Sequence, residues 1–207
     1  MAYDYLDRLA TPSVQAAQAA NGARQIWERF EGDRTSDRFT ENEAAFIGAR
    51  DSFYLASVSE SGWPYVQHRG GPPGFLKVLD ETTLGFADYR GNRQYISLGN
   101  IAADDRVALI LMDYPNQARL KILAHMEARD LAADPDLAAR LADPGYKGRP
   151  ERGFVLRLEA FDWNCPQHIT RRFTGPEIET VLGPMRQHVT DLEAENAALK
   201  AQLAARV

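Results

Sequence analysis

Six stretches between residues 52 and 161 have the length and composition of β-strands, and polar or glycine-containing breaks separate them. They are rich in Phe, Tyr, Val, Ile and Leu, which favour the half-buried surface of a sheet. Phe154, Leu156 and Leu158 alternate with Arg157 and Glu159, a period of two that indicates one buried face. The six stretches are SFYLASVS, YVQHR, TTLGFAD, VALILM, LKILAHMEA and FVLRLEAF.

The breaks between these stretches predict how the strands are connected. SESGWP and LDET read as tight hairpin turns, so most neighbouring strands should run antiparallel. Closure of such a sheet removes its exposed edges. We therefore predict a mainly β fold with flanking helices, built on a small six-stranded antiparallel barrel.

Helical signals precede and interrupt the strands. Residues 1–36 predict a helical arm. Thr40 and Glu43 form a capping box ahead of a short amphipathic helix. Asp134, followed by Pro135, predicts a second helix start, because proline is favoured at the first helical position. A further short helix is expected at YISLG.

The C-terminal segment, residues 176–207, carries a heptad pattern, which leaves 37–175 for the barrel. Asn196 occupies an a position, where a polar residue selects register and a two-stranded state. Glu195 and Lys200 fall at g and e, the positions of an interchain pair. The alternative is a single amphipathic helix that packs on its own domain. The a and d positions are Met185, Val189, Leu192, Asn196, Leu199 and Leu203.

Charge and composition narrow the classes of partner. The net charge of −5 gives no support for nucleic acid or an anionic membrane as the main partner. No apolar run approaches the roughly 20 residues that span a bilayer. Cys165 is the single cysteine, so an internal disulfide framework is excluded. Together these features favour the cytoplasm.

The segment ADYRGNRQYISLGNI, residues 87–101, is the first candidate site. It places Arg93 and Gln94 after a strand and at the entrance to a helix. Helix N–H groups and a guanidinium together suit a phosphate. Asn92 could cap the helix and also orient a ligand. An ordinary surface turn is the alternative.

Two other segments carry unusual residues. QHRGGPPG, residues 67–74, would let backbone approach a flat ligand, or it forms a turn at a barrel corner. In FDWNCPQHI, residues 161–169, Cys165 and His168 lack a second pair for zinc, and we expect a buried structural thiol. Trp163 suits the wall of a site for a ring system. Arg119 begins a strand, where a barrel-facing cation needs an anionic or carbonyl partner.

In order and spacing, these motifs resemble the flavin-binding split barrels related to pyridoxamine 5'-phosphate oxidase, in the branch of predicted flavin-nucleotide-binding proteins. The similarity runs from about Phe39 to Phe173 and is strongest in RDSFYLASVSESGWPYVQHRGGPPGFLKVLD, in GFADYRGNRQYISLGNI with DDRVALILM, and in FDWNCPQHI. The resemblance implies a split barrel and a homodimer with FMN at the subunit interface.

The resemblance also implies a set of cofactor-binding residues. The strand after PY would contact the flavin, Arg93 and Gln94 the phosphate, and Trp163 the isoalloxazine. Arg119 would be contributed across the interface, and Arg69 or Arg119 could stabilise the reduced flavin. The full set is Gln67, His68, Arg69, Gly70, Ala87, Asp88, Asn92, Arg93, Gln94, Arg119 and Trp163.

This chain departs from the true pyridoxamine phosphate oxidases at two places. It has GGPP where they carry a lysine, and HITRRF where they carry an arginine-histidine-aspartate-arginine substrate motif. We therefore predict an FMN-dependent oxidoreductase that uses a reduced nicotinamide or a small organic substrate. The alternatives are a non-catalytic flavin-binding or storage module, a true pyridoxamine or pyridoxine phosphate oxidase, and the same barrel with a deazaflavin or haem.

Overall fold

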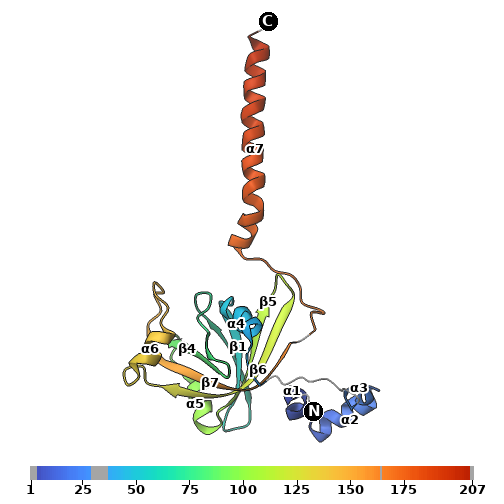
Figure 1. Ribbon diagram of the computed structural model, residues 1–207, viewed down its shortest axis with the longest axis vertical. Helices are drawn as coiled ribbons and strands as arrows, with labels where there is room; N and C mark the ends of the chain where they lie inside the picture. The colour runs from blue at the N-terminus through green and yellow to red at the C-terminus, as the bar shows by residue number, and fades with distance from the viewer. Residues whose placement is uncertain (1–3, 29–36, 164, 206–207) are drawn as a thin grey trace. The chain divides into compact units, whose positions relative to one another are not determined.

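The computed structural model describes residues 4–28, 37–163 and 165–205. Its centre is a seven-stranded sheet with the strand order β2-β1-β5-β6-β7-β4-β3, in which all neighbours are antiparallel. The sheet curls into the split barrel of Figure 1. The strands are β1 (Ser52–Val58), β2 (Pro64–Gly70), β3 (Lys77–Asp80), β4 (Thr83–Tyr89), β5 (Arg106–Asp113), β6 (Ala118–Arg129) and β7 (Pro150–Trp163).

The predicted fold class is confirmed, with one strand more than the sequence pattern indicated. The additional strand, β3, is four residues long and pairs with β4 through the LDET hairpin. Its alternation is too short to stand out between PPGF and that turn. The SESGWP turn joins β1 to β2, with Gly62 at a φ of 82°, a conformation that glycine adopts without strain.

The barrel interior is filled by the alternate residues of its strands. An aromatic cluster of Phe53, Phe75, Phe86 and Phe154 lies at its centre, and the rings of Phe53 and Phe86 meet edge to face at 5.3 Å. Aromatic side chains bury the most apolar area per residue, so this cluster contributes strongly to the core. β5, β6 and β7 add aliphatic side chains to the same core.

Short helices cover parts of the barrel. The capping box of Thr40 and Glu43 is confirmed at the start of α4 (Glu41–Gly48). α6 (Pro135–Leu141) begins as predicted, with the Asp134 carboxylate accepting a hydrogen bond from the Leu137 N–H. α6 packs against the outer side of β4 at Gly85, where an added Cβ would lie 2.8 Å from a Leu141 methyl group. The expected helix at YISLG is α5 (Ile96–Ala103).

The N-terminal segment contains α1 (Asp4–Leu9), α2 (Pro12–Ala20) and α3 (Arg24–Glu28). α1 lies on the barrel: Tyr5 is buried there, the Lys121 ammonium lies 4.7 Å from its ring centre, and Arg8 pairs with Glu159 of β7. Residues 29–36 of the predicted arm lie outside the described residues, so the predicted boundary at residue 36 stays a prediction.

The described chain forms two compact units. The first comprises residues 1–113 and 118–167, and the second comprises 114–117 and 168–207. The second unit contains α7 (Gly175–Ala204), which starts at a capping box of Thr174 and Glu177. No helix among the described residues is long and apolar enough to cross a membrane.

Candidate functional site

A cavity of about 170 Å³ opens beside the edge strand β2, between β4, the 91–95 loop and the start of α5. Its wall is polar, with arginine, carboxylate, amide and hydroxyl groups, while Phe154 and Leu98 add apolar surface. The lining residues are Tyr65, Gln67, Arg69, Asp88, Tyr89, Gly91, Asn92, Arg93, Gln94, Tyr95, Ile96, Ser97, Leu98, Glu151 and Phe154.

The alternation of β2 determines which of its side chains face the cavity. Tyr65, Gln67 and Arg69 line it, whereas Val66 and His68 lie on the opposite, exposed face. The Ser97 hydroxyl of α5 donates a hydrogen bond to Gln67 Oε1 at 2.9 Å. This bond ties the edge strand to the helix and fixes the Gln67 amide at the cavity wall.

Arg69 connects two strands that lie far apart in the strand order of the sheet. Its Nη1 donates to Asp88 Oδ1 of β4 at 2.6 Å, although β2 and β4 are not neighbours in the strand order. Arg152 of β7 contacts the other Asp88 oxygen at 3.3 Å, because β4 and β7 pair with Asp88 opposite Arg152. Two guanidinium groups therefore share one carboxylate at the cavity.

Burial dominates the electrostatics of this cluster. Desolvation raises the pKa of Asp88, and it outweighs the lowering effect of Arg69 and Arg152. One donor stays unused: the buried Arg69 Nε has no hydrogen-bond partner among the described residues. A buried donor without a partner is costly, so this N–H favours an acceptor that enters the cavity.

The loop before α5 presents further donors. Arg93 has a φ of 64° and Tyr95 a φ of 53°, left-handed conformations that non-glycine residues adopt rarely. Strained backbone of this kind is concentrated at ligand sites. Within the described part of the chain, the Arg93 guanidinium lines the cavity and forms no hydrogen bond or ion pair.

Asn92 does not cap α5, contrary to the prediction. The N-cap position is Tyr95, and no side chain bonds the first helical N–H groups. Asn92 Oδ1 instead accepts from the Gln94 N–H at 3.1 Å, closing a turn before the helix starts. The extra residues of this turn move the helix start beyond the reach of Asn92. The N–H groups of the first turn of α5 therefore remain available at the cavity.

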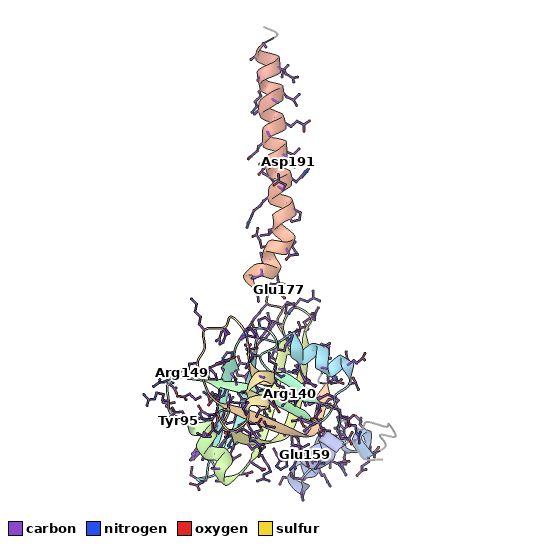
Figure 2. The ribbon with its side chains drawn as sticks, turned by 60° about the vertical axis from the view of Figure 1, so that its left-hand side comes forward. Tyr95, Arg140, Arg149, Glu159, Glu177 and Asp191 are labelled. Carbon is purple, nitrogen blue, oxygen red and sulfur yellow. The ribbon has the colours of Figure 1, made fainter. Side chains whose placement is uncertain are left out.

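Sequence reasoning missed several residues at the cavity. Tyr65 and Ser97 could have been found from the period of two in β2 and from the helix start. The Arg152 guanidinium stacks 5.1 Å from the Tyr95 ring centre, and the Tyr95 hydroxyl donates to Glu151. Figure 2 labels Tyr95. Glu151 and Arg152 reach the site through the β4–β7 register, which no local pattern in the sequence indicates.

Three residues of β2 and β4 that were predicted to bind the cofactor do not line this cavity. His68 faces outward and contacts the Tyr54 ring edge to face at 5.5 Å. Gly70 ends β2, next to Asp51. Ala87 points away from Asp88 and packs with Leu137 and Leu141 under α6.

Arg119 and Trp163 lie away from the cavity as well. Arg119 pairs with Met112 in the β5–β6 register and lies on the outer side of the sheet, so it does not face the barrel interior. Trp163 ends β7, at the opposite end from Glu151. Its indole N–H donates to Glu43 at 2.7 Å, and its ring meets Phe46 edge to face.

Cys165 is exposed, so the prediction of a buried thiol is wrong. It follows Trp163 beyond the last strand, where the chain has left the barrel core. Asn164, between them, lies outside the described residues. Among the residues that the structure describes, no cluster of three or more His, Cys, Asp or Glu side chains could hold a metal ion.

Comparison with models of protein families shows to which family this chain belongs. The family model for pyridoxamine 5'-phosphate oxidase matches residues 39–156, more than half of the chain. The chain belongs to this family. The matched range contains every residue of the cavity, whereas Trp163 and α7 lie outside it. No curated protein matches the chain.

Comparison with solved structures gives matches of low sequence identity. A candidate pyridoxamine 5'-phosphate oxidase from Lactobacillus delbrueckii is 24% identical over 61% of this chain and 94% of its own, with a TM-score of 0.46. An FMN-binding protein from Syntrophomonas wolfei is 12% identical over 74% and 95%, with a TM-score of 0.42. An F420 reductase is 20% identical over 60% and 98%, with a TM-score of 0.44. Family membership rests on the family model.

The raised pKa of Asp88 gives a pH-dependent prediction. The folded state holds this proton more tightly than the unfolded chain, so the resulting stability is fully present below the unfolded pKa of about 3.9 and is lost as the pH rises through the folded pKa. Asp88→Asn cannot lose this proton and serves as the reference. We expect the free energy of unfolding of wild type to fall relative to that of Asp88→Asn as the pH rises from about 4 to 7.

Urea unfolding at several pH values measures this difference. Asp104→Asn is the control, because hydrogen bonds from Arg106 lower the pKa of Asp104 to about 2. The difference in free energy of unfolding between wild type and Asp104→Asn should therefore not change with pH above about pH 5. If the Asp88 difference instead grows in favour of wild type as the pH rises, pairing with the arginines outweighs burial and the account of the cluster is wrong.

Proposed function

We propose that this member of the pyridoxamine 5'-phosphate oxidase family binds FMN in the cavity beside β2 and acts as an oxidoreductase. The observation that carries the proposal is the buried Arg69 Nε–H, which has no partner among the described residues and belongs to a side chain that lines this cavity. Family membership and the polar wall around the cavity support the same conclusion. The residues present therefore fit a phosphorylated, polar cofactor.

The phosphate of FMN would lie at the start of α5. Arg93 lines this part of the cavity without an ion-pair partner among the described residues, and the first turn of α5 has no side-chain cap. N–H groups at a helix start and a guanidinium together suit a dianion. Asn92 and Gln94 hold each other in the turn and would support Arg93.

Gln67, Arg69 and Asp88 would hold the remaining polar groups of the cofactor. Gln67 is fixed by Ser97, and Arg69 by Asp88, so both side chains are positioned before a ligand enters. Positions that are fixed in advance lower the entropy cost of binding. The Arg69 Nε–H would then donate to an oxygen or ring nitrogen of the flavin.

A bound flavin supplies hydride and electron transfer. The chain's own contribution would be a positively charged donor: Arg69, which is held in place by Asp88, would lie beside the ring and stabilise its reduced, anionic form. The electron donor would be a reduced nicotinamide or a small organic substrate. Oxidation of NADH or NADPH by the FMN-loaded protein distinguishes this role from flavin storage.

The outer face of β2, β1 and β5 would bind a second copy of this chain. It is apolar and exposed, with Val66 62% and Tyr54 40% accessible. Cross-strand pairs such as Tyr54 with His68 and Ala56 with Val66 make it continuous. His68 and Arg119 lie on the outer side of the sheet. A homodimer on this face would therefore allow them to serve the cofactor site of the other subunit.

Replacement of Arg93 tests the phosphate position. We expect Arg93→Ala to weaken FMN binding about tenfold or more, because a charge-assisted hydrogen bond contributes about 1.5–3 kcal/mol. Fluorescence titration with FMN and with riboflavin measures the effect, and riboflavin affinity should hardly change, since riboflavin lacks the phosphate.

Arg90→Ala is the matched control, because Arg90 lies three residues earlier and pairs with Glu151 instead of lining the cavity. Its FMN affinity should stay close to that of wild type. An Arg93→Ala protein with unchanged FMN affinity, or with equal losses for FMN and riboflavin, would refute the phosphate assignment.

A charge on the outer face tests the proposed dimer. Val66→Glu buries a carboxylate in the interface between copies, so we expect it to lower FMN affinity although Val66 points away from the cavity. Ile26→Glu is the control, because Ile26 is equally exposed, at 66%, but belongs to α3. Equal FMN affinity of the two variants would contradict a site that needs the second subunit.

A further inference from the structure

α7 has an apolar stripe that nothing among the described residues covers. The helix runs from Gly175 to Ala204, and none of its residues is buried. Large apolar side chains along it are accessible, including Met185 at 62% and Val189 at 53%. A helix in water without a packed face is marginally stable, so this stripe favours a partner.

The structure extends the heptad pattern beyond the sequence prediction. Ile178 and Leu182 lie on the same helix, both are exposed, and their spacing continues the a and d positions from Met185 toward the helix start. Pro184 lies inside the helix at an outer c position, away from the stripe. Figure 1 shows α7 as one continuous helix. The stripe consists of Ile178, Leu182, Met185, Val189, Leu192, Asn196, Leu199 and Leu203.

We propose that α7 pairs with α7 of a second copy of this chain as a parallel, in-register, two-stranded coiled coil. Asn196 decides between the alternatives. In a parallel pair, a positions face a positions, so the two Asn196 amides lie opposite each other and can bond. In an antiparallel pair, Asn196 faces a d position and its amide is buried against an apolar side chain, at a cost in free energy.

Charges beside the stripe agree with a second copy as the partner. Glu195 at g lies opposite Lys200 at e of the other copy, and in the heptad before, His188 lies opposite Glu193, to which an imidazole N–H can donate a hydrogen bond. Each pair occurs twice because the two helices are identical. The same surface is thus complementary to itself.

The flanking charges alone would also permit an antiparallel pair, with Glu179 opposite Lys200 and Arg186 opposite Glu193. Glu179 and Arg186, however, already form an ion pair within one helix at 2.7 Å. An antiparallel pair would also bury the Asn196 amide without an amide partner, and this cost favours the parallel arrangement. The proposal does not rest on flavin binding, because α7 lies outside the matched range 39–156.

Disulfide cross-linking of the full chain tests this arrangement. Leu199→Cys, in a Cys165→Ser background, places one thiol at a d position on each helix. A parallel in-register pair brings the two thiols together, whereas an antiparallel pair separates them along most of the helix. We expect mild oxidation to convert most of the protein to a covalent dimer on a non-reducing gel.

Ala201→Cys in the same background is the matched control, because this f position lies on the outside of the pair. It should cross-link at least several-fold more slowly at the same protein concentration. The proposal is overturned if Leu199→Cys stays monomeric, which would leave α7 for an antiparallel pair or another protein. It is also overturned if both variants cross-link at equal rates, which would indicate random collision.

Discussion

The ion pair between Arg69 and Asp88 holds the site together. It joins β2, at one end of the strand order, to β4, near the other end, where no backbone hydrogen bonds connect them. The split of the barrel is therefore bridged by side chains. Both side chains are largely buried, so each charge depends on the other, and removal of one partner leaves a buried charge without compensation.

The same pair determines what the cavity can accept. Asp88 uses its two oxygens on Arg69 and Arg152, which leaves the Arg69 Nε–H without an acceptor among the described residues. Arg93 and the uncapped start of α5 add further donors to the cavity wall. A wall with more donors than acceptors suits an anionic ligand with polar substituents, and the phosphate and ring oxygens of FMN meet that description.

The sequence predicted features that depend on local spacing. Alternation identified six of the seven strands, and capping signals located α4 and α6. The resemblance to flavin-binding split barrels, and not a local pattern, implied that Gln67, Arg69 and Arg93 belong to one site, and all three line the same cavity. Features that depend on register could not be predicted in this way. Arg152 reaches Asp88 only because β7 pairs with β4, and His68 turns outward because the period of two in β2 separates it from its neighbours.

The proposed role of the cavity beside β2 is to bind FMN. The most direct test is the absorbance spectrum of the freshly purified full chain, combined with the mass of the cofactor released on denaturation. We expect a yellow protein with flavin absorbance bands and a released mass equal to that of FMN. A colourless protein whose spectrum and stability do not change on addition of FMN would contradict it.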